Sequence, residues 1–101
     1  DGLTGQQAVS IKPGKIDRSP TGTAVSARMA LLNARGRMKK GDTFTATSII
    51  GSTFQGRIVG ETSVGGKPAI IPEISGRAWV TGRCRFEIAD DDPLASGFML
   101  R

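Results

Sequence analysis

One stretch of the chain, residues 24–35, is apolar or small at nearly every position. Only three of its side chains are strongly polar: Arg28, Asn33 and Arg35. Ser19 can cap a helix, Pro20 suits a first helical turn, and Gly36 suits the C′ position. A helix that is hydrophobic on all sides belongs inside a protein. The pattern therefore predicts a buried helix over residues 24–35.

The other apolar residues predict short strands on both sides of this helix. β-Branched and aromatic residues favour strands, and glycine and proline interrupt them. Gly65 and Gly66 indicate a hairpin turn, and Pro72 indicates an edge strand or a bulge. The strands that this pattern predicts cover residues 5–11, 15–16, 43–50, 53–59, 68–74 and 76–88.

The clearest strand signal is the alternation in residues 76–88. Apolar residues occupy its even positions, and mostly charged ones its odd positions. Within it, Cys84, Trp79 and Phe86 are expected to be packing residues, because free cysteines are usually buried and the side chains of Arg83 and Arg85 would point to the opposite face. One buried helix with strands before and after it predicts an α+β fold, a curved sheet around a central helix.

The composition narrows the class of protein. A chain of 101 residues is one domain at most. With one cysteine and no histidine, an internal disulfide is excluded, a metal site is not expected, and a reducing, cytoplasmic compartment is favoured. The chain opens without the basic region of a signal peptide, and no apolar run reaches about 18 residues, so no membrane span is predicted.

The net charge of +5 raises the question of nucleic-acid binding. The basic residues are scattered, and residues 37–40 form the one cluster. One tryptophan and four phenylalanines provide no platform for base stacking. The charge is therefore interpreted as solvated surface, with no nucleic-acid partner. The acidic run 90–92 is likewise interpreted as a solvated turn rather than a cation site.

The entrance to the predicted helix has the character of an anion site. Its first turn is polar, contains Gly22 and Thr23, and follows the carboxylate of Asp17. A helix N-terminus presents free N–H groups and the positive end of the helix dipole. From these residues alone, the simpler interpretation of Asp17 is a charge that stabilises the helix. Gly22 could equally serve tight helix packing.

Several motifs follow one another in an order that is more specific than any single one. The first is Asp-Arg-Ser-Pro-Thr-Gly-Thr at residues 17–23, and the others cover residues 26–30, 48–56, 74–78 with 81–82, and 91–94 with 97–98. Together they resemble the proline racemase family, in which the first motif looks like the second half of the active site. That family includes proline racemases, hydroxyproline 2-epimerases and trans-3-hydroxy-L-proline dehydratases.

The resemblance implies a two-domain fold like that of diaminopimelate epimerase, with the active site between two central helices. Residues 1–101 resemble the C-terminal portion of that fold, and residues 90–101 are expected to pack on the missing N-terminal domain. The Cys-Gly-His motif of the other half-site is absent, so the chain is either a fragment or one of two chains. The resemblance implies no cofactor and a proline-like amino acid as ligand, and it leaves a homodimer open.

The resemblance also implies roles for individual residues. Asp17 would pair with the ring nitrogen of the substrate, and the backbone N–H groups of Gly22 and Thr23 would bind its carboxylate. Thr21 departs from the racemases and epimerases, which carry cysteine there and need a titrating group on each face of the substrate. A threonine hydroxyl is too weak an acid or base to replace a thiol of pKa about 8.5.

Threonine at position 21 is similar to the trans-3-hydroxy-L-proline dehydratases of the family. Loss of water from the neighbouring carbon then replaces reprotonation, and the Thr21 hydroxyl either hydrogen-bonds the leaving group or fills space. Two alternatives stay open. The first is a racemase or 2-epimerase that works with one thiol or with a water molecule, and the second is an inactive module that keeps only the anion-binding helix.

Overall fold

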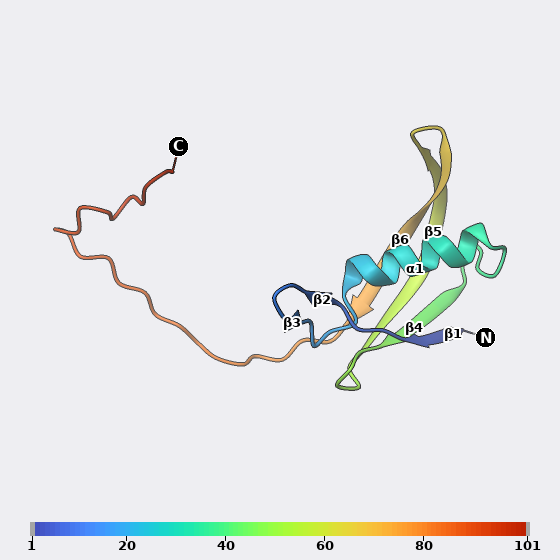
Figure 1. The fold of residues 1–101 in the computed structure, drawn as a ribbon, viewed down its shortest axis with the longest axis horizontal. Helices are drawn as coiled ribbons and strands as arrows, with labels where there is room; N and C mark the ends of the chain where they lie inside the picture. The colour runs from blue at the N-terminus through green and yellow to red at the C-terminus, as the bar shows by residue number, and fades with distance from the viewer. Residues whose placement is uncertain (1, 101) are drawn as a thin grey trace.

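The computed structural model describes residues 2–100, and its compact part is a four-stranded sheet with one helix on it (Figure 1). The sheet has the strand order β1-β4-β5-β6; β1 and β4 are parallel and the other neighbours antiparallel. Strands β2 and β3 form a separate antiparallel ribbon. The elements are β1 Leu3–Gln6, β2 Ser10–Ile11, β3 Lys15–Ile16, α1 Gly22–Ala34, β4 Thr43–Thr47, β5 Thr53–Val64 and β6 Lys67–Gly76.

The core lies where α1 crosses the sheet. Its fully buried hydrophobic residues come from the helix, from the connector that follows it and from the two central strands: Val25, Met29, Met38, Phe44, Ala46 and Ile58. At Gly56 a Cβ atom would lie 2.5 Å from Met29 Sδ and 3.2 Å from Val25 Cγ1. A side chain at this position would force Met29 to move, because the helix packs closely against the backbone of β5.

Helix α1 ends as the sequence predicts. Gly36 has φ +70°, and its N–H donates to the carbonyl of Asn33 at 3.0 Å. The next N–H, of Arg37, donates to the carbonyl of Leu32 at 2.9 Å. These two bonds form a Schellman motif, which satisfies carbonyls that the end of a helix leaves free.

The start of the helix differs from the prediction. The residue before its first turn is Thr21, and Ser19 does not cap the helix. Pro20 precedes the helix and is buried, instead of standing in its first turn. The prediction that the helix is buried on all sides is wrong for the described part of the chain. Val25 and Met29 are its buried residues, whereas one face is exposed along its length: Thr23, Ala27, Ala30, Leu31 and Ala34.

The strand predictions hold in the middle of the chain and fail at its ends. The β5–β6 hairpin turns at Gly65 and Gly66, both at positive φ, and Pro72 lies in the edge strand β6 beside a register shift between Ile58 and Gly60. The strand predicted over 5–11 is instead two short strands, β1 and β2. The α+β class is confirmed, and the sheet is not closed.

The predicted strand over residues 76–88 is wrong. After Gly76 the chain runs away from β6 as an extended, exposed segment without regular structure among its described residues (Figure 1). A strand needs a neighbour to pair its backbone groups, and here no strand lies beside it. Cys84 is exposed, and Trp79 and Phe86 are 63% and 88% exposed, so the expected packing roles are also not seen.

Candidate functional site

The loop of residues 17–21 leads into α1 and is held by the Asp17 carboxylate. Asp17 Oδ1 accepts a hydrogen bond from the Ser19 backbone N–H at 2.9 Å, and Asp17 Oδ2 accepts one from Thr21 Oγ1 at 2.8 Å. Ser19 Oγ in turn accepts the Thr21 N–H at 3.0 Å. Asp17 and Thr21 are thus in direct contact, and both carboxylate oxygens already have a partner within the loop.

These bonds favour the ionised form of Asp17. The Ser19 N–H, followed by the Thr21 and Ser19 hydroxyls, lowers the pKa of the Asp17 carboxyl, and the positive charge of Arg18 adds to the effect. Hydrogen bonds to a carboxylate favour its charged form. Because Asp17 is exposed, it can also accept a cation from outside the loop. It is therefore suited to bind an ammonium group and poorly suited to donate a proton.

Thr21 adopts an unusual backbone conformation, with φ 65° and ψ 113°. Among residues 2–100 it is the single non-glycine residue at positive φ. For a β-branched residue such a conformation is strained, at a cost of about 1–3 kcal/mol. It persists because the surrounding loop is held at several points, and strain of this kind concentrates at functional sites.

The first turn of α1 offers unpaired backbone donors. The first helical bond joins the Val25 N–H to the Thr21 carbonyl at 2.9 Å, so the N–H groups of Gly22 and Thr23 have no partner within the helix. A Cβ atom on Gly22 would meet nothing within 4 Å in this chain. Tight packing against the described residues therefore does not explain this glycine.

Two hydrogen bonds from other elements hold the outer side of the loop. Gln7 Nε2 donates to the Pro20 carbonyl, and Ser52 Oγ donates to the Arg18 carbonyl at 3.1 Å. Ser52 Oγ also lies 2.6 Å from Ser48 Oγ, and Ser48 is buried. No sequence pattern points to Gln7, and Ser48 and Ser52 are predicted only as parts of the motif over residues 48–56. The sequence signal that could have identified the two serines is Gly51, which indicates a turn between them.

A shallow hollow of about 530 Å³ lies beside the loop. The extended segment lines one part of it, and there the Arg77 guanidinium lies 4.9 Å from the centre of the Trp79 ring. The residues that line it come from the loop, from the β4–β5 turn and strand β5, and from the extended segment: Arg18, Ser19, Ile50, Gly51, Ser52, Thr53, Phe54, Arg77, Trp79 and Thr81.

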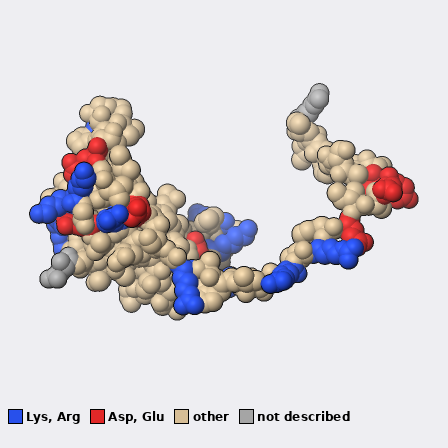
Figure 2. All heavy atoms as spheres, turned by 180° about the vertical axis from the view of Figure 1, so that it is seen from behind, with Lys and Arg blue, Asp and Glu red and all other residues tan. Residues whose placement is uncertain are grey.

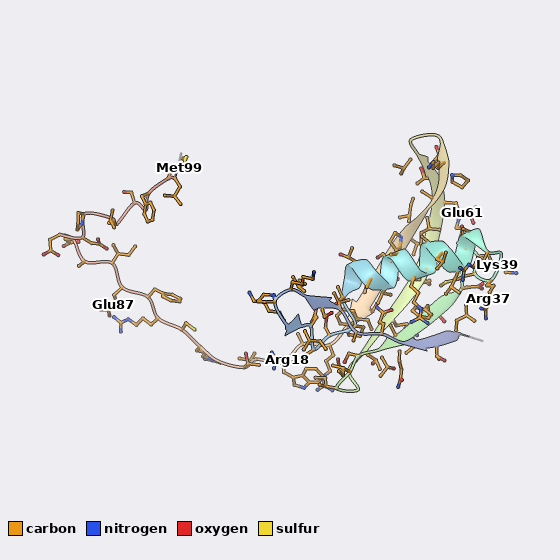
Figure 3. All side chains as sticks on the ribbon, in the orientation of Figure 1. Arg18, Arg37, Lys39, Glu61, Glu87 and Met99 are labelled. Atoms are coloured by element: carbon orange, nitrogen blue, oxygen red, sulfur yellow. The ribbon has the colours of Figure 1, made fainter. Side chains whose placement is uncertain are left out.

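Basic residues lie at both ends of α1. Arg18 lies near the N-terminal end of α1, and Arg37 and Lys39 lie at the opposite end (Figure 3). In Figure 2 the basic side chains are spread in separate groups, and acidic side chains collect at the far bend of the extended segment. Among residues 2–100, no three His, Cys, Asp or Glu side chains are placed to hold a metal ion. No described helix has the length and hydrophobicity needed to span a bilayer.

Comparisons with known proteins agree with the motifs. The family described as proline racemase matches residues 1–99. The fold is similar to a probable proline racemase from Agrobacterium radiobacter with bound carbonate, at 46% identity and a TM-score of 0.77 over 94% of this chain. It is equally similar to a hydroxyproline epimerase from Agrobacterium vitis with bound trans-4-hydroxy-L-proline, at 45% identity and a TM-score of 0.76 over 94% of this chain.

The chain is much shorter than these relatives. It covers 28% of the first protein and 27% of the second. The family match covers nearly the whole of the sequence and therefore establishes the family of the chain. The chain belongs to the proline racemase family.

Proposed function

We propose that this chain supplies one half of a cofactor-independent site that dehydrates trans-3-hydroxy-L-proline to pyrroline-2-carboxylate. The observation that carries the proposal is the presence of Thr21 at the start of α1, where its hydroxyl donates a hydrogen bond of 2.8 Å to Asp17 Oδ2. The one thiol of the chain, Cys84, lies on the extended segment, outside this loop. This half of the site therefore has no thiol to donate a proton to the substrate.

Substrate binding follows from the charges at the loop. The carboxylate of a proline-like amino acid fits the N–H groups of Gly22 and Thr23, where the helix dipole is positive. Its ring ammonium fits Asp17, whose pKa is lowered by the Ser19 and Thr21 hydrogen bonds. These two contacts would hold the ring at both ends of its amino-acid group and leave its third carbon near the Thr21 side chain.

The reaction then depends on which proton donor is present. A cysteine thiolate of the other half-site removes the α-proton, and the electron pair of that C–H bond forms a double bond to the neighbouring carbon. The C–O bond at that carbon breaks, and the hydroxyl leaves as water with the proton that the cysteine has just taken up, which regenerates the thiolate. The resulting enamine tautomerises to pyrroline-2-carboxylate. Thr21 cannot reprotonate the carbanion, because an alkyl hydroxyl is far too weak an acid.

A racemase or 2-epimerase is the second candidate. It is favoured by the two solved relatives, whose names are those of a racemase and an epimerase. In this case a water molecule beside Thr21 would return the proton that the second thiol returns in a two-thiol site. The third candidate is an inactive anion-binding module, in which α1 binds a carboxylate and no bond is broken.

The remaining parts of the enzyme also belong to this proposal. Residues 1–101 form the C-terminal portion, the missing N-terminal half supplies the thiol, and residues 90–101 pack on that half. We also propose a reducing, cytoplasmic location for the enzyme, which is supported by the presence of one cysteine in residues 1–101. A homodimer of the complete enzyme remains compatible with these assignments.

The test uses the full-length protein that contains this segment. It is incubated in heavy water with trans-3-hydroxy-L-proline, trans-4-hydroxy-L-proline or L-proline, and the products are followed by proton NMR. Dehydration of the first substrate, without inversion of the other two, supports the proposal. Inversion of the other two without dehydration selects the epimerase or racemase, and no reaction selects the inactive module.

A pair of matched variants tests the binding role of the loop. Asp17→Asn is expected to raise KM by at least about tenfold, because it removes the partner of the ring ammonium. Glu61→Gln removes one carboxylate from an exposed position on β5 and is expected to leave KM unchanged. An unchanged KM in Asp17→Asn would remove Asp17 from the site.

A further inference from the structure

Two backbone carbonyl groups of the loop of residues 17–21, those of Arg18 and Pro20, accept hydrogen bonds from side chains outside the loop. Each carbonyl shares a peptide plane with an N–H group that points to the opposite side. The Arg18 carbonyl shares its plane with the Ser19 N–H, which donates to Asp17 Oδ1 at 2.9 Å. The Pro20 carbonyl shares its plane with the Thr21 N–H, which donates to Ser19 Oγ at 3.0 Å. When these two carbonyls are held in place, the Ser19 and Thr21 N–H groups are therefore directed into the loop.

Ser52 fixes the first of the two planes. Its Oγ donates to the Arg18 carbonyl at 3.1 Å across 34 residues of sequence. A serine hydroxyl has one hydrogen, so Ser48 must be the donor in the contact of 2.6 Å between Ser48 Oγ and Ser52 Oγ. The Ser48 N–H also donates to the Ser52 carbonyl at 2.8 Å, which closes the turn between them. The hydroxyl groups form a chain from Ser48 through Ser52 to Arg18.

Gln7 fixes the second plane. Its side-chain amide donates to the Pro20 carbonyl, and its backbone N–H donates to the Thr47 carbonyl at 3.0 Å. The preceding carbonyl, of Gln6, accepts a bond of 3.0 Å from the Arg28 guanidinium, which also lies 5.3 Å from the centre of the Phe44 ring. Gln7 is thus anchored to β4 and to α1 before it reaches the loop.

Both contacts start from the same edge of the sheet. Strands β1 and β4 are parallel, so their carboxyl ends lie side by side, with Gln7 after one and Ser48 after the other. The edge of the sheet thus holds the loop at Arg18 and at Pro20, on either side of Ser19. Thr21 follows directly, in its positive-φ conformation.

We propose that Gln7 and Ser52 are positioning residues for the catalytic loop, with Ser48 acting through Ser52. They do not reach the substrate; they set the peptide planes that direct the Ser19 and Thr21 N–H groups and place Thr21 and Asp17. The inference rests on the proposed site, in that the loop must bind substrate, but it does not depend on which reaction follows proton removal.

The test measures α-proton exchange in heavy water by the full-length enzyme, with whichever of the three proline derivatives it converts. Ser52→Ala and Gln7→Ala are expected to lower kcat/KM by at least about tenfold. Ser52→Thr, which keeps the hydroxyl, is expected to recover most of the loss. Ser63→Ala and Gln55→Ala make the same changes at exposed positions of β5 and are expected to match the wild type.

Two readouts separate positioning from a general loss of stability. The double variant Ser48→Ala/Ser52→Ala should be no slower than Ser52→Ala alone, because Ser48 acts only through Ser52. Melting temperatures are measured for every variant, and a kcat/KM that falls only in proportion to the unfolded fraction would overturn the proposal. Wild-type exchange in both Ser52→Ala and Gln7→Ala would overturn it as well.

A crystal structure of full-length Ser52→Ala gives a further readout that needs no turnover. We expect the Asp17–Ser19 hydrogen bond to be lost or the backbone of Thr21 to leave its positive-φ conformation. An unchanged loop would overturn the positioning role even if the enzyme is inactive. Absence of dehydration in the wild type, by contrast, would overturn the proposed reaction and leave the positioning role standing.

Discussion

Residues 2–76 contain the core, whereas most of residues 77–100 extend away from it as an exposed segment (Figure 1). The two regions have similar chemistry, since both alternate apolar and polar residues. In the compact region β5 has β4 on one side and β6 on the other. In the extended region the apolar side chains are exposed: Trp79, Val80, Phe86, Ile88, Leu94, Phe98, Met99 and Leu100.

The difference shows that alternation specifies a strand only when a neighbouring strand is available. Backbone N–H and C=O groups need partners, and a lone strand has none. The extended region carries the pattern of a strand, and no described strand lies beside it. We predict that its partner strand belongs to the N-terminal half of the enzyme. The exposed face of α1, with Ala27 and Leu31, has the same character.

The largest effect on turnover is expected when residues 1–101, with both regions, are assayed without the rest of the enzyme. The isolated chain should show no turnover of any proline derivative, because it has no thiol near Thr21 and no histidine. The full-length protein assayed in parallel is the control. Product formation by the isolated chain, followed by NMR over days, would show that one half-site is sufficient.

A glycine in each region provides a matched comparison of packing. Gly56→Ala should lower the free energy of unfolding by about 1–3 kcal/mol, because its Cβ would overlap Met29 Sδ at the helix–sheet contact. Gly82→Ala, in the extended region, has nothing within 4 Å and should change it by less than about 0.5 kcal/mol. Urea unfolding of this chain measures both. Equal effects would mean that the extended region is packed.

A thiol is expected to affect the reaction at position 21 in the compact region but not at position 84 in the extended region. In the full-length enzyme, Thr21→Cys should raise racemisation or epimerisation above background, since it returns a titrating group to the empty face of the substrate. Each tenfold change in the ratio of inversion to dehydration corresponds to about 1.4 kcal/mol between two barriers. The measurement is α-carbon deuterium exchange and optical rotation with L-proline in heavy water.

Cys84→Ser is the control for this experiment and should leave the rates unchanged, because Cys84 lies on the extended region. If the Thr21→Cys enzyme folds and dehydrates yet forms no D-proline, the missing thiol is not what prevents reprotonation.

The smallest effect concerns the pKa of Asp17. Its folded pKa lies below the ordinary value of 3.8, because of hydrogen bonds from the Ser19 N–H and the Thr21 hydroxyl. A lowered folded pKa contributes stability that is present above the unfolded value and is lost as the pH falls through the folded value. Thr21→Val removes one bond and should move the midpoint upward in a carboxyl NMR titration. Ser63→Ala should not, and a midpoint unmoved by Thr21→Val would contradict the bond.

Local signals made part of this fold predictable. Gly36 ends the helix and Gly65–Gly66 closes the hairpin because a few adjacent residues determine these conformations. The motif around Asp17 located the candidate loop, and the structure brings Asp17 and Thr21 together there. The roles of Asp17, Thr21, Gly22 and Thr23 in a reaction remain predictions.

The rest could not be predicted because it depends on distant residues. Threonine disfavours positive φ, so nothing in its neighbourhood announces the conformation of Thr21. The loop that contains Thr21 accepts hydrogen bonds from Gln7 and Ser52, which are remote from the loop in sequence. The strand over 76–88 failed for the opposite reason, since its local pattern is clear and its partner is absent.

The parallel pairing of β1 with β4 has a consequence for the order of folding. Residues 43–76 can form a meander through contacts between neighbours along the chain, and α1 can dock on it early. Strand β1 must close a segment of the chain that includes the ribbon and the helix, so its pairing with β4 is the least local of the described strand pairings and has the largest loop-closure cost among them. Gln7 follows β1, so its hydrogen bond to the loop of residues 17–21 would form only after β1 has paired, and it would be lost when this edge of the sheet opens.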